Sequence, residues 1–364
     1  MKIKEITAFL EQYAPLSAQE SYDNCGLIIG NKESEISAAL ICLDCTEDII
    51  EEAISKGCNL VISHHPILFT SIKKLNGNNY IERTLLKAIE NKIAIYAIHT
   101  NLDNQLNGVN YEIAKRLNLK DLSILLPKSE KLTKLSVFIP ETHAEIVTTK
   151  LFEAGAGHIG NYSNCSFQSK GIGSFKPSDQ SNPFIGEKNK IALVEEVKLE
   201  IIVKNHQLQQ VIKTLKDVHP YEEVAYDIIP IKNTDQTEGS GMIGYLNEPI
   251  DETSFLQLLK TTFNCGIIRH TQLLNKPIKK IAFCGGSGSF LLNNAKAVNA
   301  DIFVTGDYKY HDFFDAENEI LIADIGHFES EQYTTNLLAD ILTKNFPTFV
   351  FEITGIKTNP INYF

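Results

Sequence analysis

The first and last thirds of the chain repeat one pattern, in which a short apolar run is followed by a turn, a helical stripe and a second apolar run. The interval from Leu40 to Leu60 is 20 residues, and so is the interval from Ala282 to Ile302. Such runs are typical of strands covered on both faces, and their alternation with helices indicates βαβ units. We predict an α/β body of two similar halves with largely parallel sheets; the alternative is that two unrelated βαβ units share this spacing.

The middle of the chain follows a different pattern. Between two polar stretches we expect strands over 135–139, 199–203 and 224–229, helices over 142–154 and 207–218, and a polar, glycine-rich stretch over 155–190. Two βα units and a closing strand suit a ferredoxin-like α+β module. The predicted organisation is therefore an N-terminal half over 1–127, an inserted module over 128–236 and a C-terminal half over 237–364.

Composition and charge restrict the class of protein. The 364 residues carry a net charge of −11, which argues against a broad nucleic-acid surface and against binding to an anionic membrane. No apolar run approaches the roughly 20 residues that span a bilayer, and no signal peptide is visible. Cys42 and Cys45 interrupt an apolar run, which favours buried free thiols in a reducing compartment over a redox or metal motif. We expect a soluble, cytoplasmic protein.

Ligand-type residues follow two strands of the first half. His64 and His65 come directly after an apolar run, and adjacent residues on a continuing strand point to opposite faces. The two imidazoles could reach two metal ions, or one could bind while the other supports it. Asp103 lies shortly after the next strand and is well placed as a ligand, whereas His99 could be a ligand or a buried, hydrogen-bonded histidine. The residues that could orient this region are Thr100 and Asn104.

A third cluster follows a strand of the second half. His327 and Glu331 are four residues apart at the start of an expected helix, so they share one face. Glu329 is a competing carboxylate on a different face. Each of these clusters alone is more often a structural or surface group. Ligand sites in open α/β sheets, however, lie at the carboxyl ends of the strands, where all three clusters fall.

Together the clusters supply three histidines and two carboxylates: His64, His65, His327, Asp103 and Glu331. This donor set suits zinc, iron or manganese rather than calcium. Five protein ligands exceed the needs of one tetrahedral zinc, and a carboxylate can bridge two ions, so we predict two divalent metal ions. Such a pair holds a bridging hydroxide and supports metal-assisted hydrolysis. The candidates for the surrounding hydrogen bonds are Asp44, Thr46 and His311.

Two further features could contact a substrate. The turn that contains Gly285, Gly286, Ser287 and Gly288 could offer backbone N–H groups to a phosphate or another anion, although it matches neither the P-loop nor the dinucleotide fingerprint. The alternative is a tight structural turn. His311 could be a proton shuttle or a substrate contact; the alternative is a hydrogen-bonded loop histidine.

Several motifs taken together resemble the Nif-three-like family, whose members are often called GTP cyclohydrolase 1 type 2 homologues. They are Asp23-Asn-Cys-Gly-Leu-Ile-Ile-Gly, Ile62-Ser-His-His-Pro, His99-Thr-Asn-Leu-Asp, Gly285-Gly-Ser-Gly-Ser, Thr305-Gly-Asp and Gly326-His-Phe-Glu-Ser-Glu. The segment His219-Pro-Tyr-Glu-Glu-Val-Ala-Tyr-Asp is similar to PII and CutA-like modules. One departure is Tyr22, where tryptophan would be expected in the family.

The resemblance implies a dinuclear metal centre between two similar α/β halves. It implies that His65 and Asp103 hold one ion, that His64 and His327 hold the other, and that Glu331 bridges them. It also implies a toroidal homohexamer.

The expected function is metal-dependent hydrolysis of a small, nucleotide-like or phosphorylated substrate, with Glu331 and His311 as the catalytic candidates. Nothing in these residues selects guanine. The alternative is a metal-binding, oligomeric regulatory or scaffold protein with a PII-like sensor module. Nucleic-acid binding is a third possibility, against which the acidic charge counts.

Overall fold

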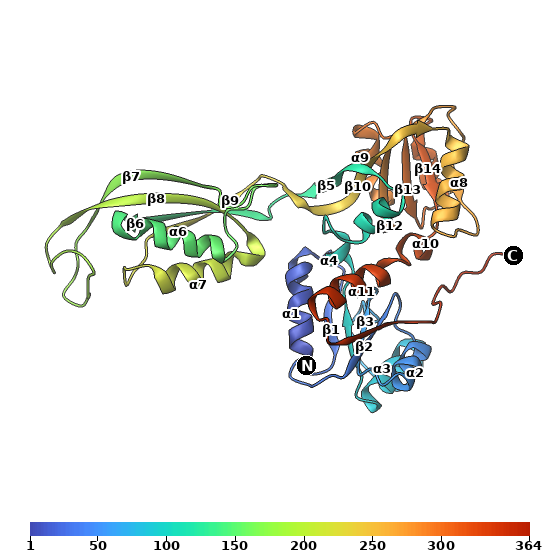
Figure 1. Cartoon of the computed structure of the whole chain (residues 1–364), viewed down its shortest axis with the longest axis horizontal. Helices are drawn as coiled ribbons and strands as arrows, with labels where there is room; N and C mark the ends of the chain where they lie inside the picture. Colours follow the sequence, from blue (N-terminus) through green and yellow to red (C-terminus); the bar gives the residue numbers. More distant parts are fainter. The chain divides into compact units, whose positions relative to one another are not determined.

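The computed structural model describes residues 1–364, which form two compact units (Figure 1). One unit contains residues 1–126 and 237–364, and the other contains residues 127–236. No helix is long and apolar enough to cross a membrane. All seven cysteines are free, and Cys42 and Cys45 are buried, as the apolar run around them predicted.

The first sheet of the larger unit has the strand order β1-β4-β3-β2-β15. β2, β3, β4 and β15 run parallel, and β1 pairs antiparallel with β4 at one edge. The strands are β1 (Gly26–Ile29), β2 (Ala38–Cys42), β3 (Leu60–Ser63), β4 (Ala94–Ala97) and β15 (Val350–Ile353). The helices around it are α1 (Ile3–Tyr13), α2 (Glu47–Ser55), α3 (Tyr80–Glu90) and α11 (Thr334–Asn345).

Burial on both faces explains the uninterrupted apolar runs in these strands. Ile41 and Ile62 pack with α1 and α11, whereas their neighbours Leu40 and Val61 pack with α2 and α3 on the opposite face. This division follows from the two-residue period of a strand. The predicted strands near Leu40 and Leu60 are therefore confirmed.

The second sheet has the order β11-β14-β13-β12-β10-β5. Its strands are β5 (Lys120–Lys128), β10 (Asp235–Ile250), β11 (Arg269–His270), β12 (Ile278–Ser287), β13 (Ile302–Gly306) and β14 (Leu321–Asp324). β12, β13 and β14 are parallel, and β11 pairs antiparallel with β14. The first sheet repeats this arrangement, because β2, β3 and β4 are parallel and β1 pairs antiparallel with β4. The helices are α5 (Val109–Arg116), α8 (Glu252–Thr262), α9 (Leu292–Ala297) and α10 (His327–Glu331).

Neither sheet is built only from residues on one side of the inserted module. α5 precedes the module, yet its Ile113 and Ala114 are buried with Phe283 of the second sheet, where β5 also pairs. α11 and β15 come from the end of the chain and return to the first sheet, where Leu338 is buried. The apolar face of a helix packs where it buries the most apolar surface. Segments from both ends of the chain therefore contribute to each sheet, and the two halves form one unit.

The smaller unit contains a four-stranded antiparallel sheet in the order β7-β8-β6-β9, with helices α6 and α7. Its elements are β6 (Leu132–Pro140), α6 (Ala144–Glu153), β7 (Ser166–Phe175), β8 (Ala192–Lys204), α7 (Leu208–Val218) and β9 (Tyr226–Ile231). This is the βαββαβ order of ferredoxin-like modules. The strand β7 was not predicted from the sequence. Most of its side chains are exposed, and they show no alternation between apolar and polar residues.

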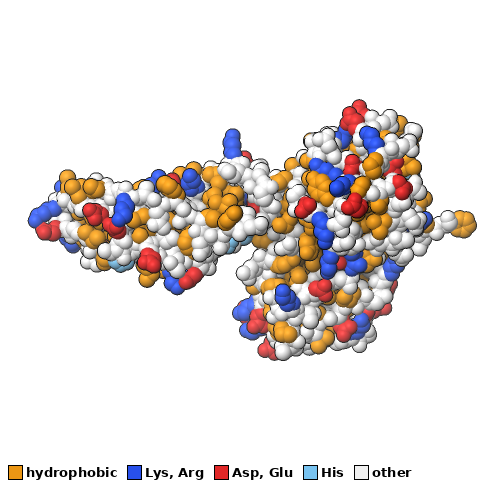
Figure 2. Space-filling view, turned by 45° about the horizontal axis from the view of Figure 1, so that its top comes forward, with side chains coloured by type: hydrophobic (Ala, Val, Ile, Leu, Met, Phe, Trp, Pro, Cys, Tyr) orange, Lys and Arg blue, Asp and Glu red, His pale blue; other side chains and the backbone are white.

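The surface carries charges of both signs. Figure 2 shows Lys and Arg side chains interspersed with Asp and Glu side chains on the visible face, with no continuous field of one sign.

Candidate metal centre

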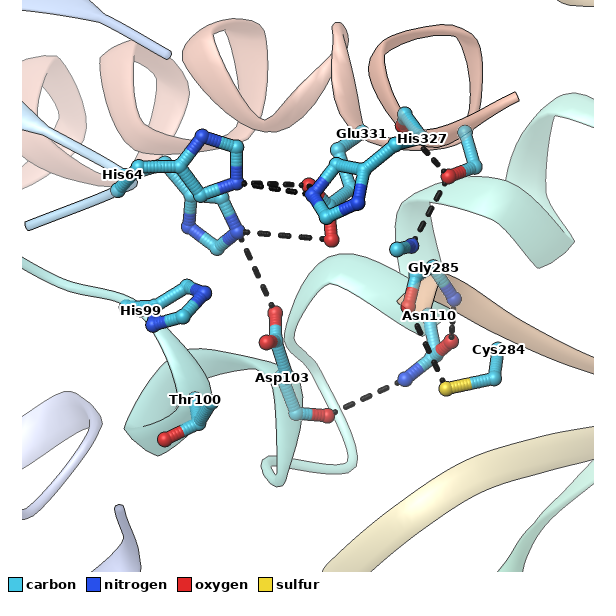
Figure 3. Close-up of polar contacts among 12 residues, drawn as sticks. His64, His99, Thr100, Asp103, Asn110, Cys284, Gly285, His327 and Glu331 are labelled. Carbon is cyan, nitrogen blue, oxygen red and sulfur yellow. Dashed lines mark hydrogen bonds and ion pairs between the residues drawn. The ribbon is translucent and has the colours of Figure 1, made fainter. Parts of the chain in front are cut away.

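The three predicted clusters meet inside the larger unit, at the ends of strands and in short helices. His64 and His65 directly follow β3, and Asp103 ends the single turn α4 (Thr100–Asp103) just after β4. His327 and Glu331 are the first and last residues of α10, which follows β14. Figure 3 shows the His64 and His327 rings and the two carboxylates pointing toward one another. A cavity of about 830 Å³ opens beside them.

One group of donor atoms forms around Oε2 of Glu331. The Nε2 atoms of His65 and His327 lie 2.9 and 3.0 Å from this oxygen. The two Nε2 atoms are 3.3 Å apart. These three side chains could hold a metal ion.

A second group forms on the other side of the same carboxylate. Nε2 of His64 lies 3.9 Å from Oε1 of Glu331 and 3.5 Å from Oδ1 of Asp103. Nε2 of His64 and Oδ1 of Asp103 are buried and have no hydrogen-bond partner. Buried polar atoms are rarely left without partners, so this pair is suited to a metal ion that would serve both. These three side chains form another group that could hold an ion.

Glu331 therefore places one oxygen toward each group. The grouping differs from the one that the family resemblance implied, because His64 lies with Asp103 and His65 lies with His327. The physical reason is that β3 ends at Ser63, so the His64 and His65 rings lie beside each other, with centres 4.9 Å apart, instead of on opposite faces of a continuing strand.

The outer nitrogen of each histidine is held by another group. Nδ1 of His64 lies 2.8 Å from the Ile98 carbonyl oxygen, to which it can donate. Nδ1 of His65 lies 2.7 Å from Oδ1 of Asp44, and Nδ1 of His327 lies 2.7 Å from Oδ2 of Asp307. Such partners fix the ring orientation and leave the Nε2 lone pair for a metal ion.

Asp44 was a candidate from the sequence, whereas Asp307 was not. The available signal for Asp307 was its position after β13, within the Thr305-Gly-Asp motif. Thr46 lines the cavity, and its side chain caps α2 by accepting from the Ile49 amide. Glu329 is buried and accepts from the Asn359 side chain at 3.2 Å, outside both donor groups.

The proximity of these groups shifts their pKa values. Burial lowers the pKa of His65, but hydrogen bonds to Asp44 and Glu331 outweigh burial and raise it to about 9. Burial also lowers the pKa of His327, but Glu331 and Asp307 favour the charged ring and raise this pKa to about 11. Burial lowers the pKa of His64 to about 4, so this ring is neutral.

The two carboxyl groups shift in opposite directions. Burial and the negative charge of Glu331 raise the pKa of Asp103 well above its ordinary value. Burial would also raise the pKa of Glu331, but the adjacent His327 holds it well below its ordinary value. The negative charge of Glu331 thus favours the protonated form of Asp103. The same negative charge would favour a bound metal cation at this site.

His99 forms a separate hydrogen-bonded unit at the edge of the centre. Its Nδ1 lies 2.9 Å from Oδ1 of Asp23, whose other oxygen accepts from the Thr100 amide at 3.0 Å and from the Thr100 hydroxyl. His99 also forms a possible metal-binding group with His64 and His65. Asn104 lines the cavity, and its side-chain amide donates to the Ala18 carbonyl oxygen at 2.9 Å.

The glycine-rich segment does not form the predicted anion site. The residues 285–287 continue β12, and three of the amides are already donated within the protein at 2.9 to 3.0 Å. The donors Gly285, Gly286 and Gly288 bind Asn110 Oδ1, Ser330 Oγ and Thr305 Oγ1 respectively. These acceptors belong to distant segments and satisfy the amides that a phosphate would need. Gly285 and Ser287 still line the cavity.

Gly286 has a packing role instead. A Cβ atom at this position would lie 2.3 Å from Oε1 of Glu331, and the residue has a φ of +63°. Only glycine gives the carboxylate this space and adopts this backbone conformation without strain.

His311 is not brought to the cavity of this chain. It is exposed in the 3₁₀ helix over residues 311–316 and contacts the rings of Tyr310 and Phe314. His311 thus does not line the cavity within the single chain, and its role as a proton shuttle or substrate contact stays a prediction.

The fold and the site define a mixed α/β protein in which buried and half-buried histidines and carboxylates converge after strand ends into groups that could hold metal ions. Comparison with known proteins gives the family. The family model described as Duf34/NIF3 (NGG1p interacting factor 3) matches residues 1–360, and the chain belongs to this family.

Relatives match along most of their length. A Halalkalibacterium halodurans protein named GTP cyclohydrolase 1 type 2 homolog is 42% identical over 324 residues, covering 88% of this chain and 87% of the relative. A Bacillus subtilis protein of the same name is 37% identical, covering 99% of this chain and 98% of the relative. The crystal structure of a Bacillus cereus protein related to NIF3 has 36% identity and a TM-score of 0.88, covering 100% of this chain and 99% of that one.

Proposed function

We propose that the protein is a dinuclear metal-dependent hydrolase that acts on a small, nucleotide-like or phosphorylated substrate. The observation that carries the proposal is the placement of Glu331, whose two oxygens face two separate groups of donor atoms. Zinc, iron or manganese suits these imidazole and carboxylate donors. His64 and Asp103 would hold one ion, His65 and His327 the other, and Glu331 would contact both.

When bound, two such ions would supply an activated water and polarise the bond to be cleaved. The chain itself supports this chemistry by fixing its donors. Asp44 and Asp307 hold the histidine rings in orientation, and the buried position of Glu331 keeps its carboxylate from competing water. No residue of the chain then needs to act as the nucleophile.

Aromatic rings at the cavity support a substrate with a flat ring. Tyr22, Phe69 and Phe290 line the cavity and are 66%, 50% and 62% exposed. Desolvation, with the nearby carboxylates of Glu20 and Asp23, raises the pKa of Tyr22 to about 12. Its hydroxyl therefore keeps its proton and can donate a hydrogen bond to a substrate oxygen. Because the glycine amides are already bonded, a phosphate would be recognised at the metal centre.

Hydrolysis assays on matched variants test this proposal. The wild-type protein, loaded with zinc or manganese, is screened against nucleotides, GTP included, and phosphoesters. Glu331→Gln should abolish the turnover that is found, while Glu329→Gln, in the same helix but outside the donor groups, should retain it. Metal-loaded protein with no turnover on any of these substrates, or equal turnover in Glu331→Gln, would contradict the proposal.

A regulatory or scaffold function is the second candidate, supported by the βαββαβ order of the smaller unit, which we compare with PII and CutA-like sensors. In that case Glu331→Gln would change metal content or assembly but no turnover would be found. Assembly as a homohexamer stays a prediction, and sedimentation velocity of the full chain measures it.

A further inference from the structure

The smaller unit contains a cavity of its own, with a volume of about 520 Å³. It is formed by the sheet, the end of β7 and the segment over 176–185. The segment is attached by the Asn182 amide, which donates to Oε1 of Glu222 at 2.9 Å. The volume is within the range of pockets that enclose small metabolites.

Aromatic rings form much of the cavity wall. Phe138, Phe175, Phe184 and Tyr221 all line it. The ring centres of Phe175 and Tyr221 are 5.8 Å apart with an interplanar angle of 63°, and those of Phe184 and Tyr221 are 6.4 Å apart at 53°. These tilted ring pairs give the cavity an aromatic wall.

A carboxylate stands beside these rings. Glu196 lies half-buried on β8, and its Oε1 accepts a hydrogen bond from the Tyr221 hydroxyl at 2.9 Å. A Cβ atom at Gly173 would lie 2.1 Å from Oε2 of Glu196, so the missing side chain on β7 makes room for this carboxylate. No Lys or Arg forms an ion pair with Glu196.

The other charged residues at the cavity also favour a cationic ligand. Glu222 and Glu223 also line it, and Lys176 is the one basic residue that does so. Three carboxylates against one ammonium group disfavour an anionic ligand. A metal ion would need several donors that converge on one point, whereas a carboxylate hydrogen-bonded to one ring of an aromatic wall is an arrangement that attracts an organic cation.

We propose that this cavity binds a small organic ammonium ion, with the aromatic rings around its substituents and Glu196 as the charge partner. The site is separate from the metal centre, since all its residues lie in residues 127–236. Binding here would give the smaller unit a ligand that neither the family name nor the relatives' names mention.

Titration calorimetry on the full chain tests the proposal with three probes. Choline and n-butylammonium are the cations, and 3,3-dimethylbutan-1-ol is the uncharged analogue of choline with the same shape. We expect at least one cation to bind saturably to the wild-type protein and the alcohol to bind at least about tenfold more weakly.

Two variants locate the binding. Glu196→Gln keeps the shape but removes the charge, and it should weaken cation binding about tenfold or more. Tyr221→Leu removes a ring and should weaken it severalfold. Glu195→Gln makes the same charge change at the adjacent strand position, outside the cavity, and should leave binding unchanged. Circular dichroism of each variant shows whether it folds.

The proposal is overturned if neither cation binds the wild-type protein saturably, or if the alcohol binds as tightly as choline. It is also overturned if folded Glu196→Gln binds the cation as well as the wild-type protein does. If Glu196→Gln fails to fold, the comparison of choline with the alcohol on the wild-type protein still decides the question of charge.

Discussion

Metal binding at the centre should release about two protons per chain at about pH 7.5. In the metal-free protein, despite burial, Asp44 and Glu331 raise the pKa of His65 to about 9. Likewise, despite burial, Glu331 and Asp307 raise that of His327 to about 11. Both rings are therefore almost fully protonated at this pH, whereas a metal ion binds only the unprotonated Nε2. His64, with a pKa lowered to about 4 mainly by burial, has no ring proton to release.

The sign of the pH dependence follows directly. Raising the pH removes protons that compete with the metal ion, so affinity should increase with pH, by about 100-fold per pH unit while two protons are displaced. Any proton that Asp103 still carries adds to this number, because its pKa is raised by burial and by the charge of Glu331.

Calorimetry measures the proton count. Manganese or zinc is titrated into metal-free protein in three buffers of different ionisation enthalpy at one pH, and the slope of the observed enthalpy against that quantity equals the number of protons released. Glu329→Gln should give the wild-type slope. Full metal binding with a slope near zero would contradict this prediction, since His65 and His327 would then carry no proton to lose.

Two further predictions concern the groups that position the ligands. Asp44→Asn and Asp307→Asn should each lower metal affinity about 10- to 100-fold, and equilibrium competition with a chelator measures this. The effect should be larger for Asp44, which is 34% exposed against 51% for Asp307, because water replaces an exposed partner more easily. Gly286→Ala should reduce metal content, measured by elemental analysis, because its Cβ would displace Glu331; Gly171→Ala, which meets open space, should not. Equal metal content in these two glycine variants would contradict the assigned role of Gly286.

The central strands could be predicted from the sequence because strands that are buried on both faces consist of uninterrupted apolar residues. Leu40 and Val61 belong to uninterrupted apolar runs, and ligand-type residues directly after such runs mark the carboxyl edge of a sheet. This rule places His64, His65 and Asp103 at the carboxyl edge of the first sheet, and His327 and Glu331 at that of the second.

The predictions that differ from the structure depend on turns, loops and long-range hydrogen bonds. Whether the Gly286 amide is free depends on Ser330, which lies 44 residues away, and no local pattern shows that hydrogen bond. The pairing of His64 with Asp103 depends on how the chain turns after β3. The outward position of His311 depends on the loop after β13. Each of these is decided by tertiary packing, which a local pattern does not contain.

The most direct test of the account is elemental analysis of the full chain, purified without chelator and reconstituted with zinc, iron or manganese. We expect about two metal ions per chain in the wild-type protein and in Glu329→Gln, with loss of metal in Glu331→Gln, because one carboxylate contacts both donor groups. Wild-type protein that takes up no metal, or Glu331→Gln that still holds two ions, would contradict it.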